Sequence, residues 1–202
     1  MIETVPTPQT PSYDEYGIVA TFSETSLAAL YTLQSQLEEV LGDAIWSTPQ
    51  RALHATIMEI ICDIDYGTSF RKQLFTDWRH RYNQIVAETI SEMSPFEITF
   101  DQLEISKRAI IVKSADSTIL NIIRSTLLSR IDLPNGTKIP PDITHCTIAR
   151  YSTALNLEDV IKQANKLSVN FSERITQFKL LEDLGPPNFD PKTIEEYDLH
   201  AQ

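Results

Sequence analysis

Apolar and polar positions along the chain follow two different periods. Short runs rich in apolar and β-branched residues are typical of strands, and they occupy 16–22, 52–62, 96–103, 109–113, 143–151, 175–184 and 193–199. Apolar residues recur at helical spacing over 25–41, 70–93, 117–130 and 157–167. Because short turns connect several of the strands, we expect antiparallel pairing and an α+β fold.

Two of the predicted strands carry the same tripeptide, His-x-Thr. It occurs at His54 and Thr56 and again at His145 and Thr147, 145 − 54 = 91 residues later. Residues i and i+2 of a strand point to the same face, so each copy presents an imidazole beside a hydroxyl. Cys146 points to the other face, which predicts a thiol in the core.

The spacing of 91 residues extends beyond the tripeptides and indicates an internal repeat. It also superposes Ser23 on Ser114, Pro49 on Pro140 and Ile57 on Ile148. Each copy reads as strand, helix, proline-containing loop and histidine strand. A pseudo-twofold axis between the halves would bring both histidine strands to one central cleft, and without a linker between them the halves should share one core.

Composition limits the classes of protein. The chain has 202 residues, of which 42% are hydrophobic, enough for a full core, and a net charge of −11 that argues against binding of long nucleic acid. No apolar run is long enough to span a membrane. We expect a disordered leader at 1–15, a single bilobal domain at 16–202, and a cytoplasmic monomer. The two cysteines lack metal-type spacing and are expected to be reduced thiols in the core. No metal or cofactor is predicted.

The paired motifs, the duplication, the segment Ile148-Ala149-Arg150 and the closing strand-turn-strand resemble the 2H phosphoesterase superfamily, which contains the LigT-like RNA ligases and cyclic phosphodiesterases. The likeness spans roughly residues 16 to 199. It implies a bilobal duplicated fold, with two antiparallel sheets facing a central cleft and helices outside. It also implies metal-independent hydrolysis of 2′,3′-cyclic phosphates or related phosphodiesters, with catalysis by His54 and His145.

The chemistry of the two motifs agrees with that implication. Opening a cyclic phosphodiester needs a base to deprotonate water and an acid to protonate the departing ribose oxygen. Imidazole, with an ordinary pKa of about 6.5, can fill either role near neutral pH. Thr56 and Thr147 would donate hydrogen bonds to phosphate oxygens. Which histidine is the base stays open.

Four further residues are candidates for substrate binding. Tyr151 has the same strand parity as His145, so we expect it to face the cleft, where it would stack on a base or cap the site unless it is an ordinary half-buried aromatic. Arg150 has the opposite parity, which makes a structural ion pair as plausible as a phosphate contact. Trp46 and Arg51 precede the first motif and would stack or bind phosphate, unless they are simply a packed indole and a solvated cation.

The expected substrate is a small cyclic-phosphate nucleotide or a short oligonucleotide. Two alternatives stay open. An RNA ligase or RNA end-processing enzyme would need an electropositive cleft despite the overall charge. A non-catalytic nucleotide-binding protein would keep the same cleft but lack the chemistry.

Overall fold

A computed structural model of the chain describes residues 2–7, 15–61, 68–135, 137, 142–183 and 190–200. Its helices are α1 (Glu24–Leu41), α2 (Thr68–Ser91), α3 (Thr118–Arg130) and α4 (Leu157–Ala164), with short 3-10 turns at Gly42–Ala44 and Gln50–Ala52. Its strands are β1 (Glu15–Thr21), β2 (Ile45–Ser47), β3 (His54–Ile61), β4 (Phe96–Phe100), β5 (Gln102–Ile105), β6 (Ala109–Lys113), β7 (His145–Tyr151), β8 (Phe171–Ile175), β9 (Gln177–Asp183) and β10 (Lys192–Asp198). The α+β class is confirmed.

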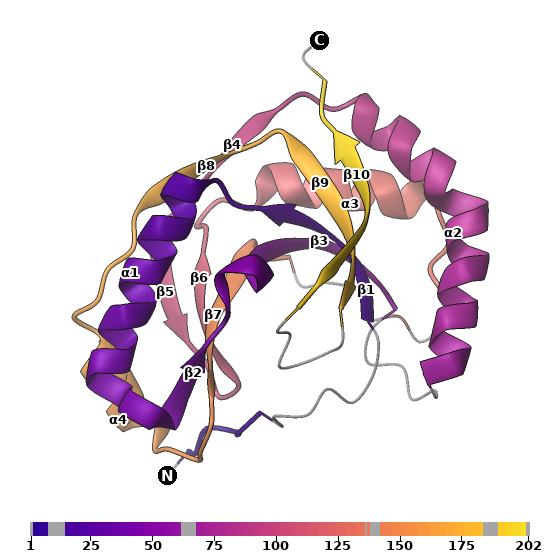
Figure 1. Ribbon diagram of the computed structural model, residues 1–202. Coiled ribbons are helices and arrows are strands. Elements are labelled where there is room, and N and C mark those ends of the chain that lie inside the picture. The colour runs from indigo at the N-terminus through magenta and orange to yellow at the C-terminus, as the bar shows by residue number, and fades with distance from the viewer. Residues whose placement is uncertain are drawn as a thin grey trace.

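The strands form two four-stranded antiparallel sheets and one two-stranded sheet (Figure 1). The first sheet has the order β10-β9-β1-β3 and the second β2-β7-β6-β5, while β4 pairs with β8. The histidine strands are β3, at an edge of the first sheet, and β7, inside the second. The two strands contact each other although they belong to different sheets.

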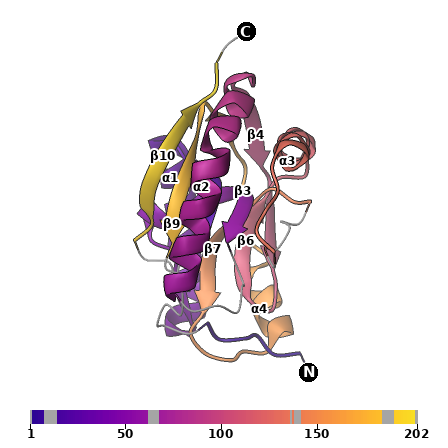
Figure 2. The same ribbon diagram turned by 90° about the vertical axis from the view of Figure 1, so that its right-hand side faces the viewer.

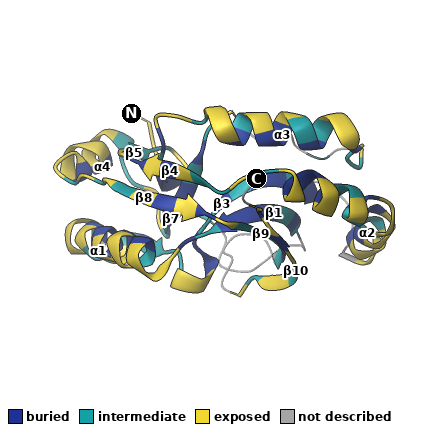
Figure 3. Cartoon of the chain, turned by 90° about the horizontal axis from the view of Figure 1, so that it is seen from above, coloured by how far each residue is buried: buried dark blue, intermediate teal, exposed yellow. Residues whose placement is uncertain are grey.

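The helix of each repeat packs on the histidine strand of the other repeat. Helix α1 follows β1 of the first sheet but packs on β2 and β7 of the second, and α3 follows β6 of the second sheet but packs on β3 of the first. Helix α4 packs against α1. Helix α2 packs against α3 and also covers β3 and β10 (Figure 2). The two helix pairs therefore lie at opposite ends of the molecule, with their buried faces turned inward (Figure 3).

One hydrophobic cluster runs through both halves, as the lack of a linker predicts. Ile57 and Ile148, equivalent residues of β3 and β7, are both fully buried in it. Aromatic rings extend the cluster: Tyr16 of β1 stacks on Phe75 of α2 with ring centroids 3.8 Å apart. Burial of this apolar surface holds the repeats in a fixed relation.

The predicted strand 96–103 is wrong in one respect, because it is two strands in different sheets. The chain leaves β4 at Asp101, whose backbone N–H donates to the Lys113 carbonyl at 3.2 Å and whose carboxylate accepts from the Ala115 N–H at 3.0 Å. These bonds turn the chain from the β4–β8 pair into the second sheet. The short strands β2 and β8 were not predicted.

The segment 2–7 differs from the disordered leader expected there. Thr4 is buried, its N–H donates to the Leu155 carbonyl at 2.8 Å, and the Thr7 N–H donates to the Tyr151 carbonyl at 2.9 Å. This part of the leader therefore packs beside the end of β7. Residues 8–14, Cys62 and Pro140, on which other expectations fall, lie outside the described residues. No described helix is both long and apolar enough to cross a membrane.

Candidate active site

Both histidine strands contain a β-bulge at the same place in the repeat. In the β1–β3 pair, Ile18 lies opposite Met58 and Val19 opposite Thr56, which leaves Ile57 without a partner. In the β6–β7 pair the register jumps in the same way and leaves Ile148 without a partner. A bulge of this kind puts two residues opposite one and shifts the alternation of faces by one residue.

The bulges return a charged residue of each strand to the face of the histidine and the threonine. Glu59 on β3 and Arg150 on β7, which are 150 − 59 = 91 residues apart, are both partly exposed, as are the His and Thr of each motif, whereas the residues between are buried. The parity predictions for Arg150 and Tyr151 are therefore wrong. The Tyr151 ring is fully buried and its hydroxyl donates to the Ser106 carbonyl at 3.0 Å.

A buried side chain from the exchanged helix holds each bulge. Arg124 of α3 donates from Nε to the Ile57 carbonyl at 2.9 Å and from Nη2 to the Thr56 and Ile143 carbonyls at 2.8 and 3.0 Å. Gln34 of α1 donates to the Ile148 carbonyl at 2.7 Å and to the Thr48 carbonyl at 2.8 Å. Arg124 ties the first motif to the segment that precedes the second.

The His54 ring is fixed by a hydrogen bond of its own. Its Nδ1 lies 2.9 Å from the Ala52 carbonyl, and because a carbonyl only accepts, Nδ1 carries the proton and donates it. Nε2 is thereby left for chemistry. Burial lowers the pKa of His54, the hydrogen bond to Ala52 opposes that shift, and the charge of Arg150 lowers the pKa further.

His145 lies in a more strongly charged neighbourhood. Its pKa is lowered to about 4, chiefly by burial and further by the charges of His54, Arg124 and Arg150, while Glu104 opposes the shift. The carboxylate of Glu104 is 2.6 Å from Nζ of Lys113, the residue paired with His145 on β6. The two imidazoles are thus close enough to interact electrostatically, and burial with this cationic neighbourhood lowers both pKa values and favours the neutral form of each ring.

Arg150 is the cation common to both histidines, since its charge acts on the pKa of each. Trp46 lies directly opposite it on β2, so the indole shares the face of Arg150. Arg51 is separate from this group. It lies in the 3-10 turn before β3 and forms an exposed ion pair with Asp190 at 3.1 Å.

The sequence reasoning missed Glu59, Lys113 and Glu104. For Glu59 a signal was present: in both strands two adjacent apolar residues, Ile57-Met58 and Ile148-Ala149, interrupt the alternation just before the charged residue. Such a doubled apolar position indicates a bulge. Lys113 and Glu104 had no comparable signal, because they reach the site through pairing of β5, β6 and β7.

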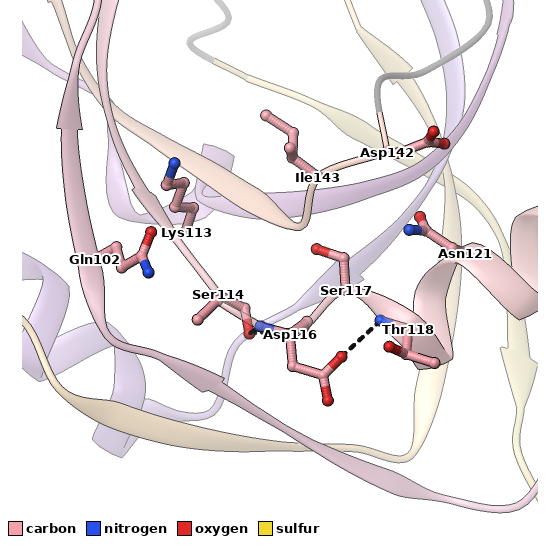
Figure 4. Close-up of a pocket in the computed structure, with 10 residues that line it drawn as sticks. Gln102, Lys113, Ser114, Asp116, Ser117, Thr118, Asn121, Asp142 and Ile143 are labelled. Atoms are coloured by element: carbon pink, nitrogen blue, oxygen red, sulfur yellow. Dashed lines mark hydrogen bonds between the residues drawn. The ribbon is translucent and has the colours of Figure 1, made fainter.

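A polar pocket of about 350 Å³ lies beside Lys113, the residue paired with His145 (Figure 4). It is bounded by the ends of β5 and β6, the start of α3 and the segment before β7. Lys113 and Gln102 reach it from the sheet, and Ser117 and Asn121 from the helix side. The pocket has the size of a small-molecule site and mixed hydrogen-bonding groups.

Cys146 contributes packing rather than chemistry. It is fully buried, and burial raises the pKa of its thiol to about 12, against a smaller opposing effect of a hydrogen bond from the His54 backbone. The thiol therefore lies between the two motifs as a neutral group and is a poor nucleophile. Within the described parts of the chain, no group of three or more His, Cys, Asp or Glu side chains is arranged to hold a metal.

Comparison with known proteins identifies the family. Residues 66–186, more than half of the chain, match the model of the 2′-5′ RNA ligase superfamily, so the chain belongs to it. The matched region contains His145 and Thr147 and begins after the first motif. No curated protein matches the sequence.

Solved structures agree on the fold. TT0787 of Thermus thermophilus has a TM-score of 0.67 at 14% identity, covering 93% of this chain and 99% of its own. E. coli LigT in its apo form has a TM-score of 0.62 at 13% identity, covering 93% and 98%. LigT complexed with 3′-AMP has a TM-score of 0.57 at 14% identity, covering 93% and 99%. The predicted membership of the 2H phosphoesterase superfamily and its LigT-like fold is confirmed.

Proposed function

We propose that this protein is a metal-independent phosphodiesterase that hydrolyses 2′,3′-cyclic phosphates or short oligonucleotide phosphodiesters by general acid–base catalysis with His54 and His145. The observation that carries the proposal is that both histidines, on contacting strands of two different sheets, interact with each other and with one arginine. The crystal structure of LigT with 3′-AMP supports a small nucleotide as the ligand class.

The reaction needs two proton transfers and stabilisation of one charged phosphate. One histidine takes a proton from water as the water oxygen bonds to phosphorus, and the other gives a proton to the ribose oxygen as its bond to phosphorus breaks. Nε2 is the reacting atom of His54, because Nδ1 is held by Ala52. Arg150 and the hydroxyls of Thr56 and Thr147 stabilise the charge that develops on the phosphate oxygens.

The histidine that acts as acid must gain a proton that it lacks in the free protein. Burial and neighbouring cations lower the pKa of both imidazoles and favour their neutral form. A bound phosphodiester anion places a negative charge beside them and favours the imidazolium form. We place the remainder of the substrate in the polar pocket beside Lys113, since Lys113 is paired with His145.

The test is turnover of 2′,3′-cyclic mononucleotides and of short 2′-5′ and 3′-5′ linked oligonucleotides in the presence of EDTA. His54→Ala and His145→Ala should each lower kcat by about 10²- to 10⁴-fold. His80→Ala, which removes an exposed histidine on α2, is the matched control and should leave kcat unchanged. Full activity in both site variants, or activity abolished by EDTA, would refute the proposal.

A further inference from the structure

Two buried side chains link the two motifs in opposite directions. Arg124 of α3 donates to the carbonyls of the first bulge and to the carbonyl of Ile143, which precedes the second motif. Gln34 of α1 donates to the carbonyl of the second bulge and to the carbonyl of Thr48, which precedes the first motif. Each exchanged helix therefore joins the bulge of one motif to the segment that leads into the other.

A bulge does not by itself require an arginine. It places carbonyls outside the regular ladder, and buried carbonyls need a donor. At the second bulge the neutral amide of Gln34 provides one. A buried guanidinium is more costly, because the charge loses its hydration. Arg124 is 5% exposed, and burial lowers its pKa from the ordinary value, although the charge of Asp142 opposes that shift. The cost indicates that the guanidinium provides more than one neutral donor could.

What the guanidinium adds is a planar set of donors that point in several fixed directions. Its Nε and Nη2 donate to β3 at 2.9 and 2.8 Å, and Nη2 also donates to the Ile143 carbonyl at 3.0 Å. Its Nη1 donates to Oδ1 of Asn121, three residues earlier on α3, at 2.8 Å. All three nitrogens are engaged, so the orientation of the group is fixed, and with it the separation of the two backbone segments.

The same side of α3 holds the backbone immediately before His145. Ser117, the N-cap of α3, and Asn121 and Arg124 within the helix lie four and then three residues apart, which places them on one side. The Thr144 N–H donates to Oγ of Ser117 at 2.8 Å. Burial is the main cause of the lowered pKa of His145, and the charge of Arg124 adds to it, so the guanidinium lies near that imidazole. Helix α3 thus fixes the start of the second motif, and Arg124 connects it to the first.

We propose that Arg124 is a positioning residue for the reaction, which holds the backbones of both motifs in the relation that lets the two histidines act on one phosphate. This inference rests on the proposed function. Arg124 does not bind the substrate in this role, because its donors are taken by backbone carbonyls and Asn121. A displacement of about 1 Å in a catalytic group can lower a rate about 10²-fold. Loss of the link should therefore appear in kcat more than in KM.

The experiment separates the geometry of the guanidinium from its charge. Arg124→Met removes both, whereas Arg124→Lys keeps the charge but replaces the fork with a single ammonium. Each variant should lower kcat for cytidine 2′,3′-cyclic monophosphate about 10²-fold and change KM less than about threefold. Arg130→Lys is the matched control, the same change six residues later on α3, where the side chain bonds Thr89 and Glu92 of α2. It should leave kcat unchanged.

Backbone amide NMR spectra give a readout that does not depend on activity. Loss of a hydrogen bond to a carbonyl changes the resonance of the N–H in the same peptide group, which here belongs to Ile57, Met58 and Thr144. In Arg124→Lys all three resonances should shift, and in Arg130→Lys they should stay in place. The spectra also show whether each variant is folded, and Arg124→Lys carries the test if Arg124→Met does not fold.

The outcomes separate the two proposals. Wild-type kcat in folded Arg124→Lys, or a loss confined to KM, overturns the positioning role and leaves the hydrolase standing. If the wild type turns over no cyclic nucleotide, the hydrolase proposal fails, and the amide spectra test the link between the motifs alone. Shifts in both motifs then support the link, and shifts in only one motif overturn it.

Discussion

Strands β3 and β7 present the same backbone features in the same order. Each begins with a His-x-Thr tripeptide, continues with an apolar residue that has no partner in its sheet, and then turns a charged residue to the face of the motif. They differ in the sign of that charge, in their strand neighbours, and in the side chain that holds the bulge. The two repeats thus share the same backbone geometry, while the charges around the two motifs differ.

That difference matters because the proposed chemistry is itself asymmetric. Either imidazole can act as the base or as the acid. The phosphate and the rest of the substrate, in contrast, cannot exchange places in the site. One cation, Arg150, acts on both histidines, whereas the equivalent position of the other strand carries the carboxylate of Glu59. In the proposed mechanism this cation favours the phosphate on its own side. The field around a symmetric pair can therefore define one direction of binding.

The most direct test of the asymmetry is to remove the cation. Arg150→Gln should lower kcat/KM about 10²- to 10³-fold, because it removes the cation that acts on both histidines and that, in the proposed mechanism, stabilises the developing phosphate charge. Because the Arg150 charge lowers the pKa of both histidines, the variant should also move the acidic limb of the pH–rate profile to higher pH. Steady-state kinetics from pH 5 to pH 8 measure both effects (about three pH units, enough to define a limb). An unchanged kcat/KM would mean that Arg150 is structural.

The two bulge supports should differ in their contribution to stability. Arg124→Met leaves the Ile57, Thr56 and Ile143 carbonyls without their guanidinium donor, so the free energy of unfolding should fall by about 3 kcal/mol. Gln34→Met should lower it by only about 1 kcal/mol, since it removes one neutral donor group from the Ile148 and Thr48 carbonyls and the Ile148 carbonyl still accepts from the Thr48 N–H at 2.9 Å. Urea denaturation of both variants measures the difference. Equal losses would contradict the idea that Arg124 joins the two motifs.

His145 should make stability depend on pH in the acidic range. Its pKa is about 4 in the folded protein and 6.5 in the unfolded chain, so between these values the unfolded state binds a proton that the folded state does not. The free energy of unfolding therefore decreases as pH falls from 6.5 to 4, by up to about 3 kcal/mol from this residue. The wild type should lose more stability than His145→Asn over this interval in denaturant titrations. Parallel losses in the two proteins would show that His145 is not the responsible group.

The smallest effect is expected at the polar pocket. Gln102→Ala should raise KM a few-fold and leave kcat unchanged, because the side chain lies at the pocket wall beside Lys113 and not at the histidines. Initial rates over a range of substrate concentrations separate the two constants. A fall in kcat with constant KM would place Gln102 in the chemistry instead.

Much of the arrangement was predictable from periodicity. The helices at 25–41 and 117–130 follow from apolar spacing. Helix α1 is capped at its start by Ser23, whose Oγ accepts from the Ser26 N–H at 3.4 Å, and at its end by Gly42, which has a φ of +55°. The duplication followed from the spacing of the two tripeptides. These are local or linear properties, which the order of residues carries without reference to the fold.

The parity of Arg150 and Tyr151 was predicted wrongly because strand alternation was extended through a bulge. A bulge belongs to a pair of strands, and only the register of β6 against β7 shows that Ile148 has no partner. The division of 96–103 into two strands has a similar cause, since Asp101 turns the chain only through bonds to Lys113 and Ala115, which come later in the sequence.

The α+β class, the repeat and the two His-x-Thr motifs were all readable in the order of residues, because they depend on side-chain type and spacing. Which residues accompany the histidines was settled by the fold. Contact between β3 and β7, the exchange of α1 and α3, and the two bulges bring Arg150 to the site, leave Glu59 with an unsatisfied oxygen, and bury Tyr151. Each of these depends on pairing between residues distant in the chain, and a one-dimensional pattern contains no information on which residues will meet.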